Sequence, residues 1–229
     1  MSNILLVESE QLMRHALAAW LREQSNISLV IDVGAVDAAV ECLRTQSIDA
    51  IVMEWNLPGV AGLELVERWR RQYPQTALVV ATRYTDDPFS SRLLQLGVAA
   101  LLSKFSPLDE LRQGLRAALN GQRFVGNDIA QRLAFAGRLN TEKSPFDGLS
   151  NRELQVMMMF AEGMNAQAIS ARLCVSPKTV STYRYRMFEK LGVRGEAELT
   201  RLAYRYGILD HSAGPGDRLA VARVQSSRH

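Results

Sequence analysis

Cysteine and histidine are scarce in this chain, and their placement excludes two classes of protein. Cys42 and Cys174 are the only cysteines, far apart and without metal-type spacing, so neither a disulfide scaffold nor a structural zinc site is expected. The three histidines, His15, His211 and His229, are too scattered to form a metal or catalytic set. We expect two reduced thiols in a cytoplasmic protein, and no cofactor.

Long apolar runs are also missing. No run approaches the ~20 residues that a transmembrane helix needs, and residues 1–20 lack the layout of a signal peptide, so no membrane partner is expected. The sequence has neither a nucleophile–base set nor a glycine-rich phosphate loop, so we do not expect an enzyme. Acids slightly outnumber bases in residues 1–125, whereas the remainder is basic, which suits a nucleic-acid partner for the second half.

Residues 3–120 alternate between apolar strands and amphipathic helices. Strands are predicted at 4–7, 28–33, 50–53, 77–81 and 99–102, and helices at 11–24, 35–46, 62–72, 88–96 and 107–120. The first helix is predicted to turn Leu12, Ala16, Ala19 and Trp20 inward. Five buried strands joined through helices require right-handed crossovers, which predicts a five-stranded parallel sheet in a flavodoxin-like α/β fold.

Four polar residues follow different strands of this predicted sheet: Glu8, Glu54, Thr82 and Lys104. Because ligands of such sheets bind beyond the carboxyl ends of the strands, we expect these side chains to converge in one pocket.

Residues 175–193 have the features of a DNA-reading helix. Ser176 is a good N-cap, Pro177 suits the first helical position, and Gly192 can end the helix. One face is apolar, and the opposite face carries the polar residues Lys178, Ser181, Thr182 and Tyr185. Such an outer face suits the major groove of DNA better than a protein core.

The neighbouring segments complete an all-α unit of four helices. Ser150 and Glu153 form a capping box that opens a helix through Glu162, and further helices are predicted at 166–173 and 196–206. Four helices in about sixty residues fit a small helix-turn-helix module. The alternative is a protein-binding bundle.

The segments L-S-N-R-E-L-Q at 149–155 and A-I-S-A-R-L-C-V-S-P-K-T-V at 168–180 resemble the four-helix domain of LuxR/NarL-type regulators. The resemblance implies that the third helix reads double-stranded DNA and that homodimers bind inverted repeats. We predict base contacts from Ser181, Thr182 and Tyr185, and phosphate contacts from Lys178, Thr179, Arg184, Arg186 and the hydroxyl of Tyr183. Leu199, Leu202 and Tyr206 are dimer candidates, with core packing as the alternative.

The first half, with N-L-P-G-V-A-G-L-E at 56–64, resembles the receiver domain of bacterial response regulators. The resemblance implies that Thr82 is a switch hydroxyl and that Lys104 holds a phosphoryl group. This sequence departs from the receiver family at three positions. Glu54 occupies the position of the phosphoacceptor aspartate, Ser9 replaces one of two Mg²⁺-binding acids, and Leu101 replaces the aromatic switch residue. In-line phosphoryl transfer tolerates little misplacement, and Mg²⁺ needs carboxylate anchors.

We therefore hypothesise a pseudo-receiver that is not switched by aspartyl phosphate, which argues against a cognate sensor kinase and against Mg²⁺ binding. Either Glu54 pairs with Lys104 and imitates the phosphorylated form, or the domain is only a dimerisation or partner-binding scaffold.

Segments at 87–97, 121–125, 129–133 and 144–150 resemble the GacA/UvrY branch of these regulators. We predict a receiver-like domain at 1–120, a linker with a short helix at 121–146, a LuxR-type helix-turn-helix domain at 147–210, and a disordered tail at 211–229. The predicted function is DNA-binding transcription regulation. The alternative is an antagonist that sequesters a related regulator by forming a heterodimer, which the intact DNA-reading face argues against.

Overall fold

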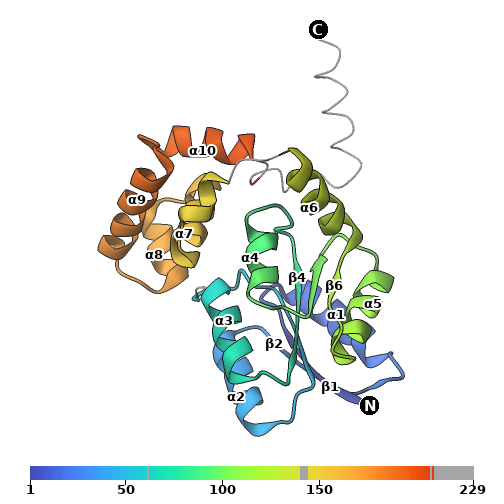
Figure 1. Cartoon of the computed structure of the whole chain (residues 1–229). Helices are drawn as coiled ribbons and strands as arrows, with labels where there is room; N and C mark the ends of the chain where they lie inside the picture. The colour runs from blue at the N-terminus through green and yellow to red at the C-terminus, as the bar shows by residue number, and fades with distance from the viewer. Residues whose placement is uncertain (61, 140–143, 207, 209–229) are drawn as a thin grey trace.

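The first half of the chain folds around a parallel β-sheet. The computed structural model describes residues 1–60, 62–139, 144–206 and 208. The sheet has the order β2-β1-β3-β4-β5-β6 (Figure 1), and its strands are β1 (Ser2–Val7), β2 (Ile27–Val33), β3 (Ala50–Met53), β4 (Ala77–Thr82), β5 (Ala100–Ser103) and β6 (Phe124–Val125). The parallel α/β fold is as predicted.

The sheet has six strands instead of the predicted five. Phe124 pairs with Ala100 and Val125 pairs with Leu101, so β6 extends the edge beside β5. This strand has only two residues and lies in the predicted linker. A two-residue strand has too few positions to show alternation, so its sequence carries no strand signal.

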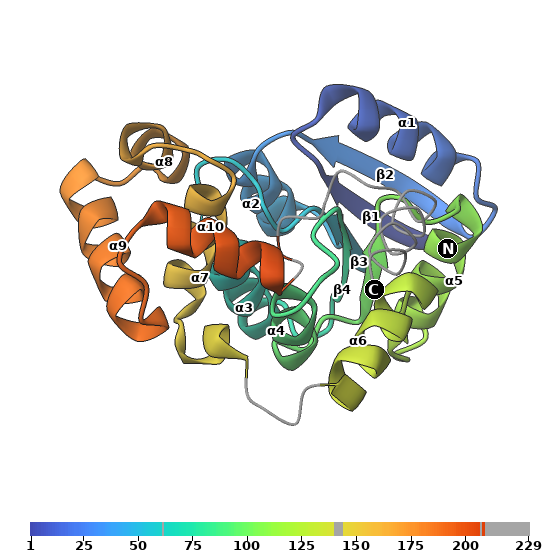
Figure 2. The same cartoon turned by 90° about the horizontal axis from the view of Figure 1, so that it is seen from above.

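Helices cover both faces of the sheet. Helices α1 (Gln11–Arg22) and α5 (Leu108–Leu119) pack on one face, and α2 (Val36–Thr45), α3 (Gly62–Gln72) and α4 (Phe89–Gln95) pack on the other (Figure 2). Alternate residues of β1 point to opposite faces, with Ile4 and Leu6 toward α1 and α5, and Leu5 and Val7 toward the other layer. Helix α6 (Asn127–Leu139) packs against α4 and β5.

The inward face predicted for α1 was wrong for Leu12, Ala16 and Ala19, whereas Trp20 is half-buried and packs against the core on that side of the sheet. Leu12 is 86% exposed, and Ala16 and Ala19 are also exposed. The buried residues are Leu17, Ala18 and Leu21. The helix carries two apolar stripes, and packing against the sheet selects the one with more apolar surface.

The loop between β3 and α3 is held by a close backbone approach. A Cβ atom at Gly62 would lie 1.7 Å from the carbonyl oxygen of Trp55, so only glycine fits there. This contact fixes the start of α3 against the chain that leaves β3 and carries Asn56 into the pocket described below.

The second half is an all-helical unit. It consists of the 3₁₀ turn η1 (Pro145–Gly148), α7 (Asn151–Ala161), α8 (Ala166–Leu173), α9 (Pro177–Leu191) and α10 (Glu196–Arg205). The predicted capping box is present, since Ser150 Oγ accepts from Glu153 N–H and Glu153 accepts from Ser150 N–H. Its core, around Leu154 and Met187, is continuous with the α2–α4 layer of the sheet unit. Within the described ranges, no helix is both long and apolar enough to cross a membrane. The predicted tail at 211–229 lies outside the described residues.

Candidate nucleic-acid interface and strand-end pocket

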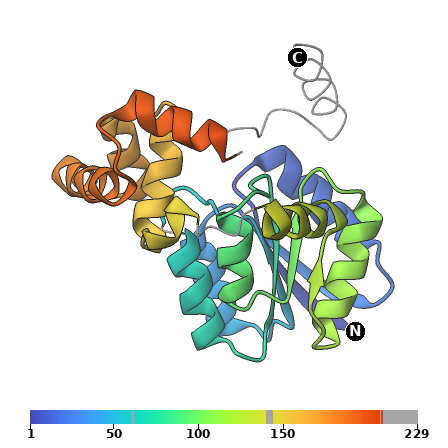
Figure 3. The same ribbon diagram turned by 45° about the horizontal axis from the view of Figure 1, so that its top comes forward.

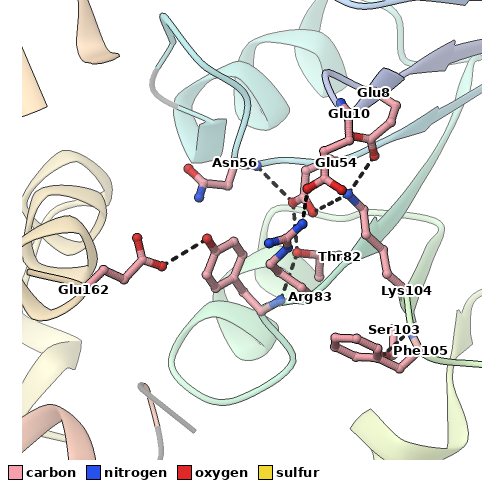
Figure 4. Close-up of polar contacts among 11 residues, drawn as sticks. Glu8, Glu10, Glu54, Asn56, Thr82, Arg83, Ser103, Lys104, Phe105 and Glu162 are labelled. Carbon is pink, nitrogen blue, oxygen red and sulfur yellow. Dashed lines mark hydrogen bonds and ion pairs between the residues drawn. The ribbon is translucent and has the colours of Figure 1, made fainter. Parts of the chain in front are cut away.

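The structure brings the four predicted strand-end residues into one pocket (Figure 4). Lys104 Nζ lies 2.7 Å from Glu8 Oε2 and 3.2 Å from Glu54 Oε2. Thr82 Oγ1 donates a hydrogen bond of 2.9 Å to Glu54 Oε1. One buried ammonium group therefore serves two carboxylates, and the second oxygen of Glu54 is held by the hydroxyl at the end of β4.

The charged side chains of the pocket are almost inaccessible to solvent. The side chains of Lys104, Glu8 and Glu54 are 5%, 2% and 5% exposed. Burial raises the pKa of Glu54 above its ordinary value, and the Lys104 cation together with hydrogen bonds from the Asn56 N–H and the Thr82 hydroxyl offsets only part of this rise. Oε1 accepts two hydrogen bonds and Oε2 faces the Lys104 ammonium group, but the charged form of Glu54 is still disfavoured there relative to water.

The Mg²⁺ ion that the receiver resemblance implies does not fit this donor set. The nearest carboxylates, Glu8 and Glu54, are bound to Lys104, and Ser9 contributes a hydroxyl where a further acid is needed. No group of three metal-binding side chains exists among the described residues. Leu101 is fully buried in the core at β5, so that position supplies no aromatic ring that could couple to Thr82.

Helix α9 has the caps that its sequence predicts. Ser176 Oγ accepts from Thr179 N–H at 3.1 Å, and Gly192 ends the helix with φ 67°. Val180 and Met187 are fully buried, and Tyr183 is half-buried. The helix is therefore fixed in its domain by its inner face.

The outer face of α9 is open to solvent. Tyr185 is 70% exposed. Five other predicted DNA-contacting residues are also exposed: Lys178, Ser181, Thr182, Arg184 and Arg186. Thr179 is half-buried. The hydroxyls of Ser181 and Thr182 donate to backbone carbonyls one turn earlier, both at 3.0 Å. Their oxygens keep lone pairs for accepting hydrogen bonds from outside.

The predicted dimer residues on α10 lie in different surroundings. Leu199 is fully buried, so it belongs to the core of its own domain and presents no surface to a partner. Leu202 is half-buried. Tyr206 is 38% exposed and lies edge-on to the ring of Phe146, with ring centroids 5.5 Å apart. Core packing, the alternative named above, thus accounts for Leu199.

Both halves of the chain match known families. Residues 4–116 match the response regulator receiver domain, and residues 147–203 match the luxR family of bacterial regulatory proteins. The chain is 38% identical over 210 residues to the response regulator UvrY of Escherichia coli (strain K12), with 91% of this chain and 96% of UvrY covered. This chain belongs to the LuxR-type response regulators.

Other members of the family extend the comparison. The response regulator GacA of Pseudomonas aeruginosa is 38% identical over 214 residues, covering 92% of this chain and 99% of GacA. RcsB from Salmonella enterica serovar Typhimurium, solved bound to the promoter rprA, shares the fold with a TM-score of 0.66 at 20% identity, over 88% of this chain and 97% of RcsB. Like the other LuxR-type response regulators, this chain is a DNA-binding transcription factor and not an enzyme.

Sequence reasoning missed the residues that join the two halves of this response regulator. Tyr84, two residues after Thr82, donates its hydroxyl hydrogen to Glu162 Oε1 at 3.0 Å. Arg172 of α8 lines a cavity of about 480 Å³ beside Glu54 and Glu162. These residues are far apart in sequence, and nothing in their local patterns indicates that the domains dock there.

Proposed function

We propose that this chain is a GacA/UvrY-type transcription regulator in which Glu54 takes the place of a phosphorylated aspartate. The observation that carries the proposal is that Thr82 Oγ1 and Lys104 Nζ both bind the carboxylate of Glu54. The receiver resemblance assigns these two groups to the phosphoryl group. A carboxyl group built into the side chain at this point engages them without phosphorylation.

The surroundings of Glu54 support this reading over phosphotransfer. Its side chain is one methylene longer than that of aspartate. The carboxylate is buried and accepts a hydrogen bond from the Asn56 N–H at 3.1 Å. A nucleophile for in-line attack must point at the phosphodonor. The second oxygen of Glu54 points at Lys104 instead. Control by a cognate sensor kinase is accordingly not part of the proposed function.

The DNA side of the proposal rests on α9. We assign base contacts to Ser181, Thr182 and Tyr185, with Lys178 and the arginines of the helix on phosphates. A homodimer on an inverted repeat would place one α9 in each of two major-groove segments about one helical turn apart. The exposed outer face argues against the alternative of a sequestering heterodimer partner, which has no need of that face.

Binding of the untreated full chain to an inverted-repeat duplex, compared with a scrambled duplex, tests the proposal. We expect specific binding without any phosphodonor, and a loss of about fivefold or more for Glu54→Gln, the lower end of typical coupling energies. Glu67→Gln, the same change at an exposed position on α3, is the matched control.

A second experiment addresses phosphotransfer directly. The full chain is incubated with Mg²⁺ and a small phosphodonor, and its intact mass is measured. We expect no phosphoryl adduct. An adduct on Glu54, or specific DNA binding that is unchanged in a correctly folded Glu54→Gln variant, contradicts the proposal.

A further inference from the structure

The sheet unit and the helical unit are joined by hydrogen bonds that avoid α9. Gly59 N–H donates to the Arg172 carbonyl at 2.6 Å, and Gln155 Nε2 donates to the Val60 carbonyl at 3.1 Å. The Arg92 guanidinium donates to two backbone carbonyls in and after η1. Among the described residues, the partners in the helical unit come from η1, the residue after it, α7 with its C-cap, or α8. Helix α9 lies on the side turned away from the sheet (Figure 3).

Tyr84 connects this interface to the strand-end pocket. Its backbone N–H donates to Thr82 Oγ1 at 3.1 Å, and the Thr82 hydroxyl in turn donates to Glu54 Oε1 at 2.9 Å. At its other end, the Tyr84 hydroxyl donates to Glu162, the C-cap residue of α7. Three hydrogen bonds in series therefore run from the carboxylate of Glu54 to the helical unit.

The ring of Tyr84 is held in place by other aromatic rings. It lies edge-on to Trp55, with centroids 5.6 Å apart, and is tilted against Phe89 at 6.3 Å. The residue is only 6% exposed. Burial, followed by the charge of Glu162, raises the pKa of Tyr84, so the hydroxyl remains a neutral donor at physiological pH. A rigid ring transmits a backbone movement at Tyr84 to the position of its hydroxyl.

We propose that Tyr84 is a positioning residue that couples the Glu54 pocket to the helix-turn-helix domain, and that the docked arrangement is the DNA-binding form. The pocket end of this coupling rests on the function proposed above for Glu54. The docked arrangement leaves the outer face of α9 exposed, so the receiver does not mask the DNA-reading residues. It instead fixes the orientation of α9, which reduces the conformational entropy lost when DNA is bound.

The position of Tyr84 explains how a receiver without an aromatic ring at Leu101 can still communicate with its output domain. Leu101 is buried in β5 and contributes no ring that can rotate. Tyr84 has its backbone N–H on the switch hydroxyl and its side chain on the output domain. It therefore reads the state of Thr82 directly, from the loop after β4 instead of from β5.

The test uses the full chain with Tyr84→Phe, which removes the hydroxyl and keeps the ring, and Glu162→Ala, which removes the acceptor. Tyr73→Phe is the matched control, because Tyr73 lies just after α3 at the opposite end of the sheet. Docking is measured by hydrogen exchange of the Gly59 amide, which is bonded to Arg172. DNA binding is measured by fluorescence anisotropy with an inverted-repeat duplex.

We expect each variant to raise the exchange rate of the Gly59 amide by about fivefold, as for the loss of a typical intramolecular hydrogen bond. We expect specific DNA binding to weaken in parallel by up to the same factor. The effects of Tyr84→Phe and Glu162→Ala should be non-additive, because both remove one contact. Tyr73→Phe should change neither quantity.

Stronger DNA binding by Tyr84→Phe would overturn the proposal, because the interface would then be a mask. Faster exchange with unchanged DNA binding would also overturn it, since docking would then not position α9. Unchanged exchange would show that Tyr84 does not hold the domains together. If Glu54→Gln has no effect while Tyr84→Phe weakens binding, the function proposed for Glu54 fails and the positioning role of Tyr84 stands.

Discussion

Replacing Lys104 with methionine is expected to destabilise the receiver strongly near neutral pH. The change keeps an unbranched apolar side chain as long as the methylene chain of lysine but removes the ammonium group that pairs with both Glu8 and Glu54. Removing one partner of a buried ion pair costs about 3–5 kcal/mol, because the remaining charge is left without compensation. We expect a value of about 3 kcal/mol, at the lower end of that range, because Glu54 can escape its charge by taking up a proton.

The pH dependence of this variant has a defined sign. The pKa of Glu54 is already raised by burial, with Lys104 as the largest opposing influence, so loss of Lys104 raises it further. A carboxyl group whose pKa is higher in the folded state contributes stability below its unfolded pKa and loses it as the pH rises through the folded pKa. The difference between wild type and Lys104→Met should therefore be smaller at about pH 5 than near neutral pH.

Urea denaturation followed by tryptophan fluorescence measures this difference. Trp20, Trp55 and Trp69, the three tryptophans of the chain, all lie in the first half, so the signal reports on the receiver. Lys178→Met, at an exposed lysine, is the control and should stay within about 0.5 kcal/mol of wild type. Adding Glu54→Gln to Lys104→Met should recover part of the loss. A cost below about 1 kcal/mol at neutral pH, independent of pH, would refute the reasoning.

Three further predictions concern the helix-turn-helix domain. Lys178→Ala should weaken binding to all duplexes alike and reduce the slope of log affinity against log salt concentration by about one. Thr182→Ala should cost about 1–3 kcal/mol of binding free energy on the specific site alone. Titrations at several salt concentrations with specific and random DNA check both, and equal losses of affinity on the two duplexes for Thr182→Ala would count against base reading. Burial acts to raise the pKa of Glu153, but hydrogen bonds from Lys190 and Ser150 outweigh it and lower the pKa, so this carboxylate contributes stability above about pH 4.5 that is lost as the pH falls through its folded pKa. Glu153→Gln keeps an acceptor for the Ser150 N–H but removes the ion pair with Lys190. It should therefore speed hydrogen exchange of α7 near neutral pH by about fivefold, as for the loss of a typical intramolecular hydrogen bond, with little effect in acid; an equal effect at both pH values would contradict the assignment.

The convergence of the pocket could be predicted from the sequence because it depends on one rule. Glu8, Glu54, Thr82 and Lys104 each occupy the carboxyl end of a parallel strand, and parallel strands end at the same edge. The caps of α9 were predictable for a similar reason, since Ser176 and Gly192 act on neighbouring backbone groups. Local geometry determines both outcomes.

Other features depend on contacts that local patterns do not encode. The phase of α1 was mispredicted because alanines form a second stripe that competes with Leu17 and Leu21. The burial of Leu199 depends on the packing of α10 against α7. The hydrogen bond between Tyr84 and Glu162 joins the surfaces of two domains. The sequence around each residue is that of an ordinary polar side chain and does not indicate the contact.

Most of the hydrogen bonds between the two domains end on main-chain carbonyls. Gly59 donates to the carbonyl of Arg172, Gln155 to that of Val60, and Arg92 to those of Asp147 and Leu149. A carbonyl is supplied by every residue type, so substitutions at these acceptor positions preserve the acceptors. Amino-acid substitutions at these positions, or replacement of the output domain by a related one, can thus preserve the interface between the domains. Among the hydrogen bonds of the described residues, the contact that a chimera could lose is the one that requires particular side chains in both domains, between Tyr84 and Glu162.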